Sequence, residues 1–131
     1  MRAAALILAA GTASAQSVEP MAPDEFLAAV EGATLTFERL GDGAPFGTEE
    51  FLGRGRTRYV MADGTCTLGV ATPRDGALCF AYPVVEGETC WWMFRQGERL
   101  LARSARLGAA DIVEVVEISD DPVVCDAVPS V

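Results

Sequence analysis

Two adjacent tryptophans, Trp91 and Trp92, are the most conspicuous candidate binding residues of this sequence. The segment Thr89–Arg95 has the composition of a strand, and successive residues of a strand point to opposite faces of its sheet. One ring is therefore expected in the core, and the other on the outside or in a groove, where it offers a ligand a stacking surface. The alternative is purely structural, with one ring in the core and the other capping a sheet face.

A short basic stripe is the second candidate. Arg54, Arg56 and Arg58 alternate with other residues, so in an extended chain their guanidinium groups project from one face. Such a stripe suits a carboxylate, a phosphate or an acidic polymer. The competing interpretation is a solvated face whose arginines pair with Glu49, Glu50 or acids of neighbouring strands.

The residue types that most catalytic mechanisms need are missing. All 10 basic residues are Arg, and the chain has neither His nor Lys. This excludes a His-based triad, a His metal site, a Lys Schiff base and a P-loop lysine. Paired carboxylates support glycosidase chemistry, but no motif places Glu86 with Glu88, or Glu114 with Glu117, in one cleft. We therefore expect a non-enzymatic protein without cofactor or metal.

The cysteines predict two disulfides. The sequence contains four of them, at Cys66, Cys79, Cys90 and Cys125. An even number with long spacings and no C-x-x-C pair fits an oxidising compartment better than zinc. Strand pairing favours Cys79–Cys90, which leaves Cys66–Cys125. That register requires a two-residue Val84-Val85 loop, for which valine is poorly suited, so Cys66–Cys79 stays open as an alternative.

The N-terminus has the pattern of a secretory signal peptide. Arg2 precedes the apolar run Ala3–Ala10, and Ala13-Ser14-Ala15 fits a cleavage site before Gln16. The run is shorter than the ~20 residues that span a bilayer, and we expect no membrane span. Cleavage removes Arg2, leaving 116 of the 131 residues and changing the net charge from −9 to −10. The expected location is periplasmic or secreted.

Residues 16–131 predict a single mainly β domain. Pro23–Glu31 has the Pro and acidic residues of a helix start, and Gly32 ends it. Gln16–Ala22 and Gly41–Gly47 are expected to be irregular. Alternating apolar and polar residues between turn signals predict strands. These are Thr34–Leu40, Gly55–Ala62, Thr65–Ala71, Ala77–Tyr82, Thr89–Arg95, Arg99–Ser104 and Asp111–Ser119. We expect an antiparallel meander that closes into a small barrel or forms a two-sheet sandwich.

Five short motifs follow one another along this domain. They are Gly32-Ala33-Thr34-Leu35, Phe46-Gly47-Thr48-Glu49, Asp63-Gly64-Thr65-Cys66-Thr67-Leu68-Gly69, Cys79-Phe80-Ala81-Tyr82 and Cys90-Trp91. In this order they resemble a family of small exported proteobacterial proteins that form a domain of unknown function. Members often carry Trp where this chain has Ala71. The resemblance implies export and a shared fold, and it implies no activity.

These observations favour a binding or interaction module. Such a module would present Trp91 or Trp92, Tyr59 and the arginine stripe to a small ligand or an envelope protein. The excess of 19 acidic over 10 basic residues argues against nucleic acid. The alternative is an inhibitor of an envelope protease or lysozyme, because negative charge would steer a cationic enzyme. A carboxylate hydrolase acting on an envelope polymer ranks last. We expect a monomer.

Overall fold

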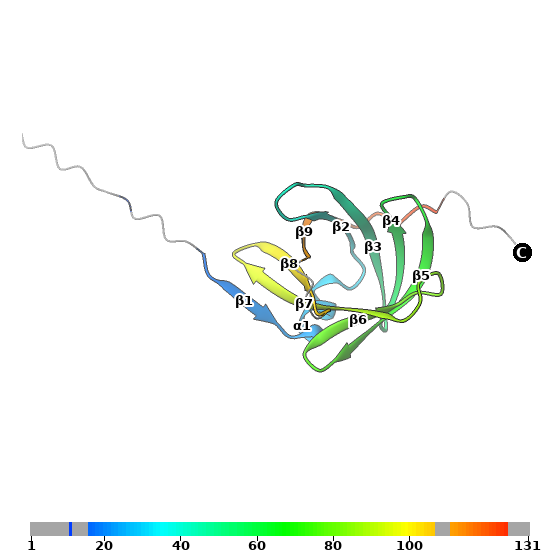
Figure 1. Cartoon of the computed structure of the whole chain (residues 1–131), viewed down its shortest axis with the longest axis horizontal. Coiled ribbons are helices and arrows are strands. Elements are labelled where there is room, and N and C mark those ends of the chain that lie inside the picture. Colours follow the sequence, from blue (N-terminus) through cyan, green and yellow to red (C-terminus); the bar gives the residue numbers. More distant parts are fainter. Residues whose placement is uncertain (1–10, 12–15, 107–110, 126–131) are drawn as a thin grey trace, which may run out of the picture.

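The computed structural model describes residues 11, 16–106 and 111–125 (Figure 1). All of the predicted signal peptide except Gly11 lies outside these residues, as do residues 126–131 of the tail. None of the helices in the described part is long and apolar enough to cross a membrane.

One short helix and nine strands make up the described chain. Helix α1 (Pro23–Val30) begins with Pro and two acids, and Gly32, at φ 80°, follows its end, as the sequence predicted. The strands are β1 (Val18–Met21), β2 (Thr34–Arg39), β3 (Pro45–Gly53), β4 (Arg56–Met61), β5 (Cys66–Arg74), β6 (Ala77–Ala81), β7 (Glu88–Gln96), β8 (Arg99–Ser104) and β9 (Ile112–Ser119).

Strands β2 to β9 form a closed antiparallel meander barrel. Each pairs with the next along the chain, and β2 closes the ring against β9 through pairs such as Phe37↔Val115. The expected barrel is thus confirmed, and the two-sheet alternative is wrong. Closure removes the free edges that an open sheet would expose. Strand β1 adds to β7 beside β6, outside the ring, from Val18↔Gln96 to Met21↔Met93.

Two strands, β1 and β3, were not expected from the sequence. Segment 18–21, expected to be irregular, is β1, because its backbone pairs with β7; this tertiary contact leaves no local pattern. Segment Gly41–Gly47 was also expected to be irregular, yet β3 begins at Pro45. Pro45, Gly47 and two consecutive glutamates conceal this strand, because they depart from the usual alternation of apolar and polar residues.

The hairpins around β6 illustrate both local and long-range control. Asp75 and Gly76 form a two-residue turn with φ 52° and 79°, the left-handed conformation that tight hairpins favour. Cys79 pairs opposite Cys90, as predicted, and the two form a disulfide. The predicted two-residue loop is wrong, however. Pairing stops at Ala81↔Glu88, and residues 82–87 form a longer loop, so valines need not adopt a tight turn.

Helix α1 packs against one end of the barrel. Phe26 and Val30 are buried, and the Phe26 ring meets the Phe51 ring edge-to-face at 5.8 Å. Backbone hydrogen bonds fix this contact: the amide of Gly32 donates to the carbonyl oxygen of Phe51 at 2.8 Å, and the Phe51 amide donates to Ala33 at 2.9 Å. The helix therefore fills the barrel at the end where β3 stops.

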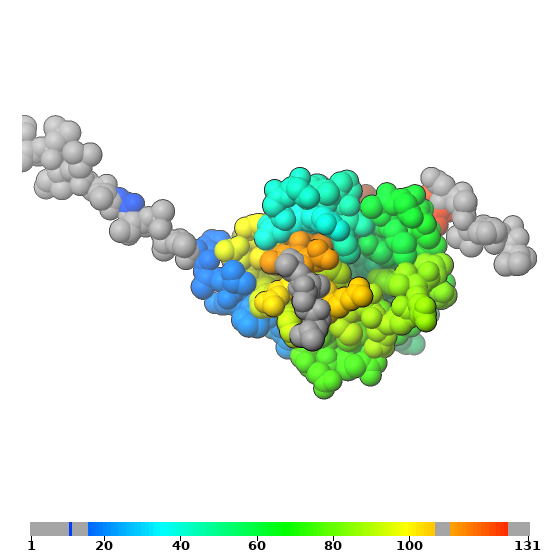
Figure 2. All heavy atoms as spheres, in the orientation of Figure 1, coloured from blue at the N-terminus to red at the C-terminus, as the bar shows by residue number. Residues whose placement is uncertain are grey.

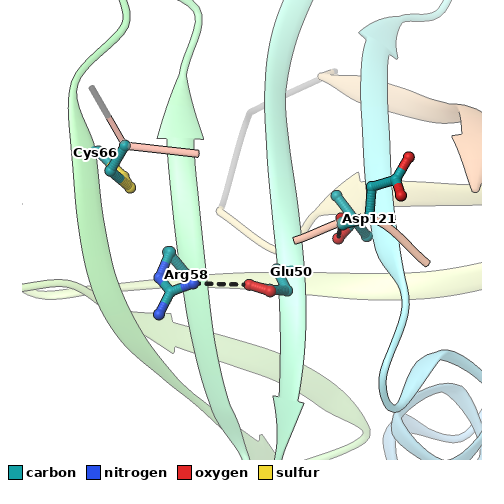
Figure 3. Close-up of polar contacts among 6 residues, drawn as sticks. Glu50, Arg58, Cys66 and Asp121 are labelled. Carbon is teal, nitrogen blue, oxygen red and sulfur yellow. Dashed lines mark hydrogen bonds and ion pairs between the residues drawn. A yellow bond between two sulfur atoms is a disulfide. The ribbon is translucent and has the colours of Figure 1, made fainter. Parts of the chain in front are cut away.

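Residues 120–125, which we call the C-terminal strap, are attached to the barrel at two points, with Asp121 beside β2 and a disulfide to Cys66 on β5 (Figure 3). The Thr34 hydroxyl donates to the carbonyl oxygen of Asp121 at 2.6 Å, and Cys125 is bonded to Cys66 on β5. The strap thus spans from β2 to β5, and its own residue Val123 is buried. The predicted Cys66–Cys125 pairing is confirmed. Both described ends, β1 in blue and the strap in red, lie on opposite sides of the body (Figure 2).

Candidate functional site

The barrel encloses a cavity of ≈ 130 Å³ that six aromatic rings line. Met61, at the end of β4, and Val85, in the loop after β6, border it at the barrel end away from α1. Val85 is exposed, so the cavity opens to solvent beside it. The aromatic side chains come from β2, β3, β4, β6, the residue after β6, and β7. They are Phe37, Phe46, Tyr59, Phe80, Tyr82 and Trp91.

The rings form two groups. Tyr82 stacks between Tyr59 and Phe80, with centroid distances of 5.3 and 6.1 Å. Phe46 and Trp91 meet edge-to-face at 5.5 Å. Stacked and edge-to-face pairs stabilise the arrangement beyond the area they bury. The cavity walls are therefore held in place by the protein's own contacts, without a ligand.

Two glycines make room for the tyrosine rings. A Cβ atom at Gly47 would overlap the ring of Tyr59, and one at Gly69 would overlap the ring of Tyr82 and the Thr57 hydroxyl. Both glycines face the interior, because Gly47 pairs with Met61 and Gly69 with Thr57. The rings consequently lie close against the β3 and β5 backbones, instead of filling the centre of the barrel.

Glu49 is the only carboxylate among the described residues that line the cavity. It faces inward from β3, only 3% exposed, and the Tyr82 hydroxyl lies 2.9 Å from both of its carboxylate oxygens. Burial raises the pKa of Glu49 to about 7, and the Thr57 and Tyr82 hydroxyls offset this only in part. The Thr57 hydroxyl is near the carboxylate, yet it forms no hydrogen bond of good geometry and is itself buried without a partner.

The two tyrosines remain neutral phenols. Burial, together with the nearby charge of Glu49, raises the pKa of both Tyr59 and Tyr82 above its ordinary value. The Tyr59 hydroxyl donates to the carbonyl oxygen of Phe46 at 3.2 Å. Near neutral pH, Glu49 is therefore the group on this wall whose charge changes.

The structure brings together two of the residues singled out from the sequence, Tyr59 and Trp91, in the wall of the cavity. Trp92 instead points outward and is 39% exposed, with the Arg103 guanidinium 5.5 Å from its ring centroid. Of the two tryptophans on β7, Trp91 therefore faces the inside of the barrel and Trp92 the outside.

The arginine stripe divides into separate environments. Arg56 and Arg58 share the outer face of β4, away from the cavity. Arg54 does not extend that face, because it lies in the turn between β3 and β4 with a left-handed φ of 56°. Arg58 pairs with the buried Glu50 at 3.0 Å, and it is the only arginine of the stripe that forms an ion pair among the described residues.

Glu49 was not predicted to be a site residue. Glu49 and Glu50 were expected only as partners for the arginines, although consecutive residues of a strand face opposite sides. A strand through Phe46–Phe51 would have required one of the two glutamates to point inward. Glu88 lies near Cys79 and Cys90, but these cysteines are joined in a disulfide and are not metal ligands.

The fold and the cavity together define a small β-barrel with two disulfides, a feature consistent with an extracytoplasmic location. Comparison with protein-family models, with curated proteins and with solved structures yields no match.

Proposed function

We propose that this protein binds a small, largely apolar molecule inside its barrel. The observation that carries the proposal is the aromatic-lined cavity of ≈ 130 Å³ with one buried carboxyl group on its wall. Binding sites for small molecules are typically concave and mostly apolar, with a few polar groups that fix orientation. The interior of an eight-stranded barrel is just wide enough to be filled by side chains or to hold one small ligand, and here part of it is a cavity.

The size of the cavity limits the ligand to about one ring. An apolar protein cavity of about 150 Å³ holds benzene, so the ≈ 130 Å³ here suits a single six-membered ring or a branched chain of similar bulk. A larger molecule would have to extend past Val85 into solvent.

Binding without catalysis is the role we favour for this cavity. Among the described lining residues, Glu49 is the only carboxylate and no cysteine is present. The paired acids of a glycosidase are therefore not assembled here. We also propose export, with a signal peptide cleaved before Gln16, because the two disulfides need an oxidising compartment. The mass of the protein purified from the periplasm tests this cleavage.

Tryptophan fluorescence offers a direct test of the binding site. Three probes of one ring each, benzyl alcohol, benzylamine and benzoate, would be titrated into the oxidised protein. Trp91 lines the cavity and Trp92 lies outside, so Trp92→Phe leaves the inner reporter and Trp91→Phe leaves the outer one. We expect at least one probe to change the emission of Trp92→Phe and none to change that of Trp91→Phe.

A variant that fills the cavity provides the control. Ala102 faces the cavity from β8, and Ala102→Leu should block probe binding at a cost of about 1–3 kcal/mol in stability, which thermal unfolding would verify. If no probe alters the Trp91 signal, or if Ala102→Leu binds as well as the wild type, the proposal is overturned. A search for an envelope protease or lysozyme that the protein inhibits would then take precedence.

A further inference from the structure

We propose that the cavity selects small organic cations, with Glu49 as the counter-ion for a protonated amine and the aromatic rings that line the cavity as its walls. This inference rests on the proposed function, because it names the chemical class of the ligand for the same cavity.

Glu49 is a buried carboxyl group whose charge no cation of the described residues matches. Four ion pairs occur among the described residues, and none of them includes Glu49. Buried carboxylates are normally paired with a cation, because the loss of hydration must be offset. The polar neighbours of Glu49 are the hydroxyls of Tyr82 and Thr57. An ammonium group in the cavity would supply the missing cation.

An aromatic wall lies around that carboxylate. Tyr59 lies opposite Glu49 in the β3–β4 pairing, and Tyr82 contacts its carboxylate oxygens. The faces of aromatic rings carry partial negative charge and attract ammonium groups, most strongly where water is excluded. Tyr59 and Phe80 cover both faces of Tyr82, so a cation would meet the other rings that line the cavity, such as Trp91. The carboxylate and the aromatic wall therefore favour the same ligand charge, and the apolar remainder of the cavity suits the hydrocarbon part of the ligand.

Charge also determines what the cavity should reject. An anion would approach a carboxylate inside a protein of net charge −9, with no compensating cation among the described lining residues. A neutral alcohol could accept a hydrogen bond from Glu49 in its protonated form. Binding of a cation and binding of a neutral alcohol should therefore differ in pH dependence, since only the cation requires Glu49 to be ionised.

The pH range of interest contains a single titrating group at this site. Glu49 faces Leu35 on β2, Tyr59 on β4, and Tyr82 after β6. Leu35 has no titratable group, and the raised pKa values of both tyrosines keep them neutral. With a Glu49 pKa of about 7, its ionised fraction rises about tenfold between pH 6 and pH 8.

Benzylamine, benzyl alcohol and benzoate test the inference, because they share a ring and differ in charge. Affinities of Trp92→Phe protein would be measured by fluorescence at pH 6 and pH 8, where the amine stays protonated. We expect benzylamine to bind most tightly and its affinity to rise about tenfold over this range. The affinity for benzyl alcohol should not rise, and benzoate should bind weakest.

Two neighbouring glutamates provide the variant and its control. Glu49→Gln should weaken benzylamine binding at least about tenfold at pH 8 and abolish its pH dependence, while benzyl alcohol still binds. Glu50→Gln, on the opposite face of β3, should leave the benzylamine affinity unchanged. Benzyl alcohol or benzoate binding as tightly as benzylamine, or Glu49→Gln without effect, would overturn the cation inference and leave the binding function standing. Failure of all three probes would overturn both.

Discussion

Glu49 and Glu50 are consecutive residues of β3, and they are buried in different surroundings on the two faces of the barrel wall. Both are nearly inaccessible, 3% and 7% exposed. Glu49 points into the cavity, where its neighbours are aromatic rings and hydroxyls. Glu50 points outward beside the C-terminal strap, where Arg58 donates to it at 3.0 Å (Figure 3).

The difference teaches that burial alone does not mark a functional acid. The outer face supplies Glu50 with a cation and a covering segment, so its charge is matched within the fold. The inner face leaves Glu49 without any cation from the described residues, and its pKa rises to about 7. Glu50 is paired within its own chain, whereas Glu49 makes no ion pair with any described residue.

The largest loss of stability should follow from removing the disulfide that holds the C-terminal strap on the outer face. The Cys66–Cys125 disulfide joins residues 59 positions apart. In Cys66→Ser/Cys125→Ser protein this loop is no longer closed in the unfolded chain, whose entropy rises, and the free energy of unfolding should fall by about 4 kcal/mol. Urea denaturation measures it. The inner face should keep its probe affinity, since Cys79–Cys90 and the cavity wall are untouched. A loss below about 1 kcal/mol would show that the Cys66–Cys125 disulfide does not stabilise the protein by restraining the unfolded chain.

The next effect concerns the inner acid. The pKa of Glu49 is about 7 in the folded protein against 4.5 for the free residue, so the folded state binds more protons between these values. Glu49 therefore contributes about 3 kcal/mol to the free energy of unfolding below pH 4.5, and this contribution is lost as the pH rises through 7. Glu49→Gln should remove this loss, making the variant more stable than the wild type at pH 8 but not at pH 4.

Glu50→Gln provides the matched control for that measurement. The free energy of unfolding of both variants and of the wild type would be measured by urea denaturation at pH 4, 6 and 8. Carboxylates that all three proteins share contribute equally, so they drop out of the differences. If Glu49→Gln follows the wild type in parallel across this range, the inner carboxyl titrates normally, and the contrast between the two faces would be lost.

A smaller effect is expected from removing the cation of the outer acid. Arg58→Ala leaves Glu50 buried without its partner, which should cost about 1–3 kcal/mol because a desolvated acceptor loses its hydrogen bond. Arg56 lies on the same face of β4 and makes no ion pair with any described residue, so Arg56→Ala is the control and should change stability by less than about 0.5 kcal/mol. Equal losses in both variants would mean that Glu50 does not depend on Arg58.

Much of the barrel could be predicted from the residues themselves. A turn over residues 72–76 was expected from the residue types, and its last two residues, Asp75 and Gly76, form it, whereas β5 continues to Arg74. The alternation of apolar and polar residues predicted most strands of the barrel. Cys79 and Cys90 could be paired because a single register brings them opposite each other. The closure of the barrel by β2 and β9 could not be derived in this way, since it joins segments about 80 residues apart whose local patterns fit a sandwich equally well.

The candidate site was less predictable, and for a physical reason. Trp91 and Tyr59 could be selected as conspicuous side chains, but their meeting in one cavity depends on ring closure. Glu49 was hidden because a charged residue inside a strand usually faces solvent. Only the assignment of β3 as a strand would have shown that Glu49 and Glu50 must point to opposite faces.

The smallest change in stability is expected at the two tryptophans, of which Trp91 lines the cavity and Trp92 lies on the outer face. Trp92 is exposed beside Arg103, and a cation–π contact at an exposed site contributes about 0.5–1 kcal/mol. Arg103→Ala should lower the unfolding free energy by this amount, and a double-mutant cycle with Trp92→Phe isolates the pairwise contribution. Probe binding reported by Trp91 should not change in Arg103→Ala protein, because Trp91 faces the cavity. A shift in probe affinity would mean that the outer face of β7 influences the cavity, and the two faces could no longer be treated as independent.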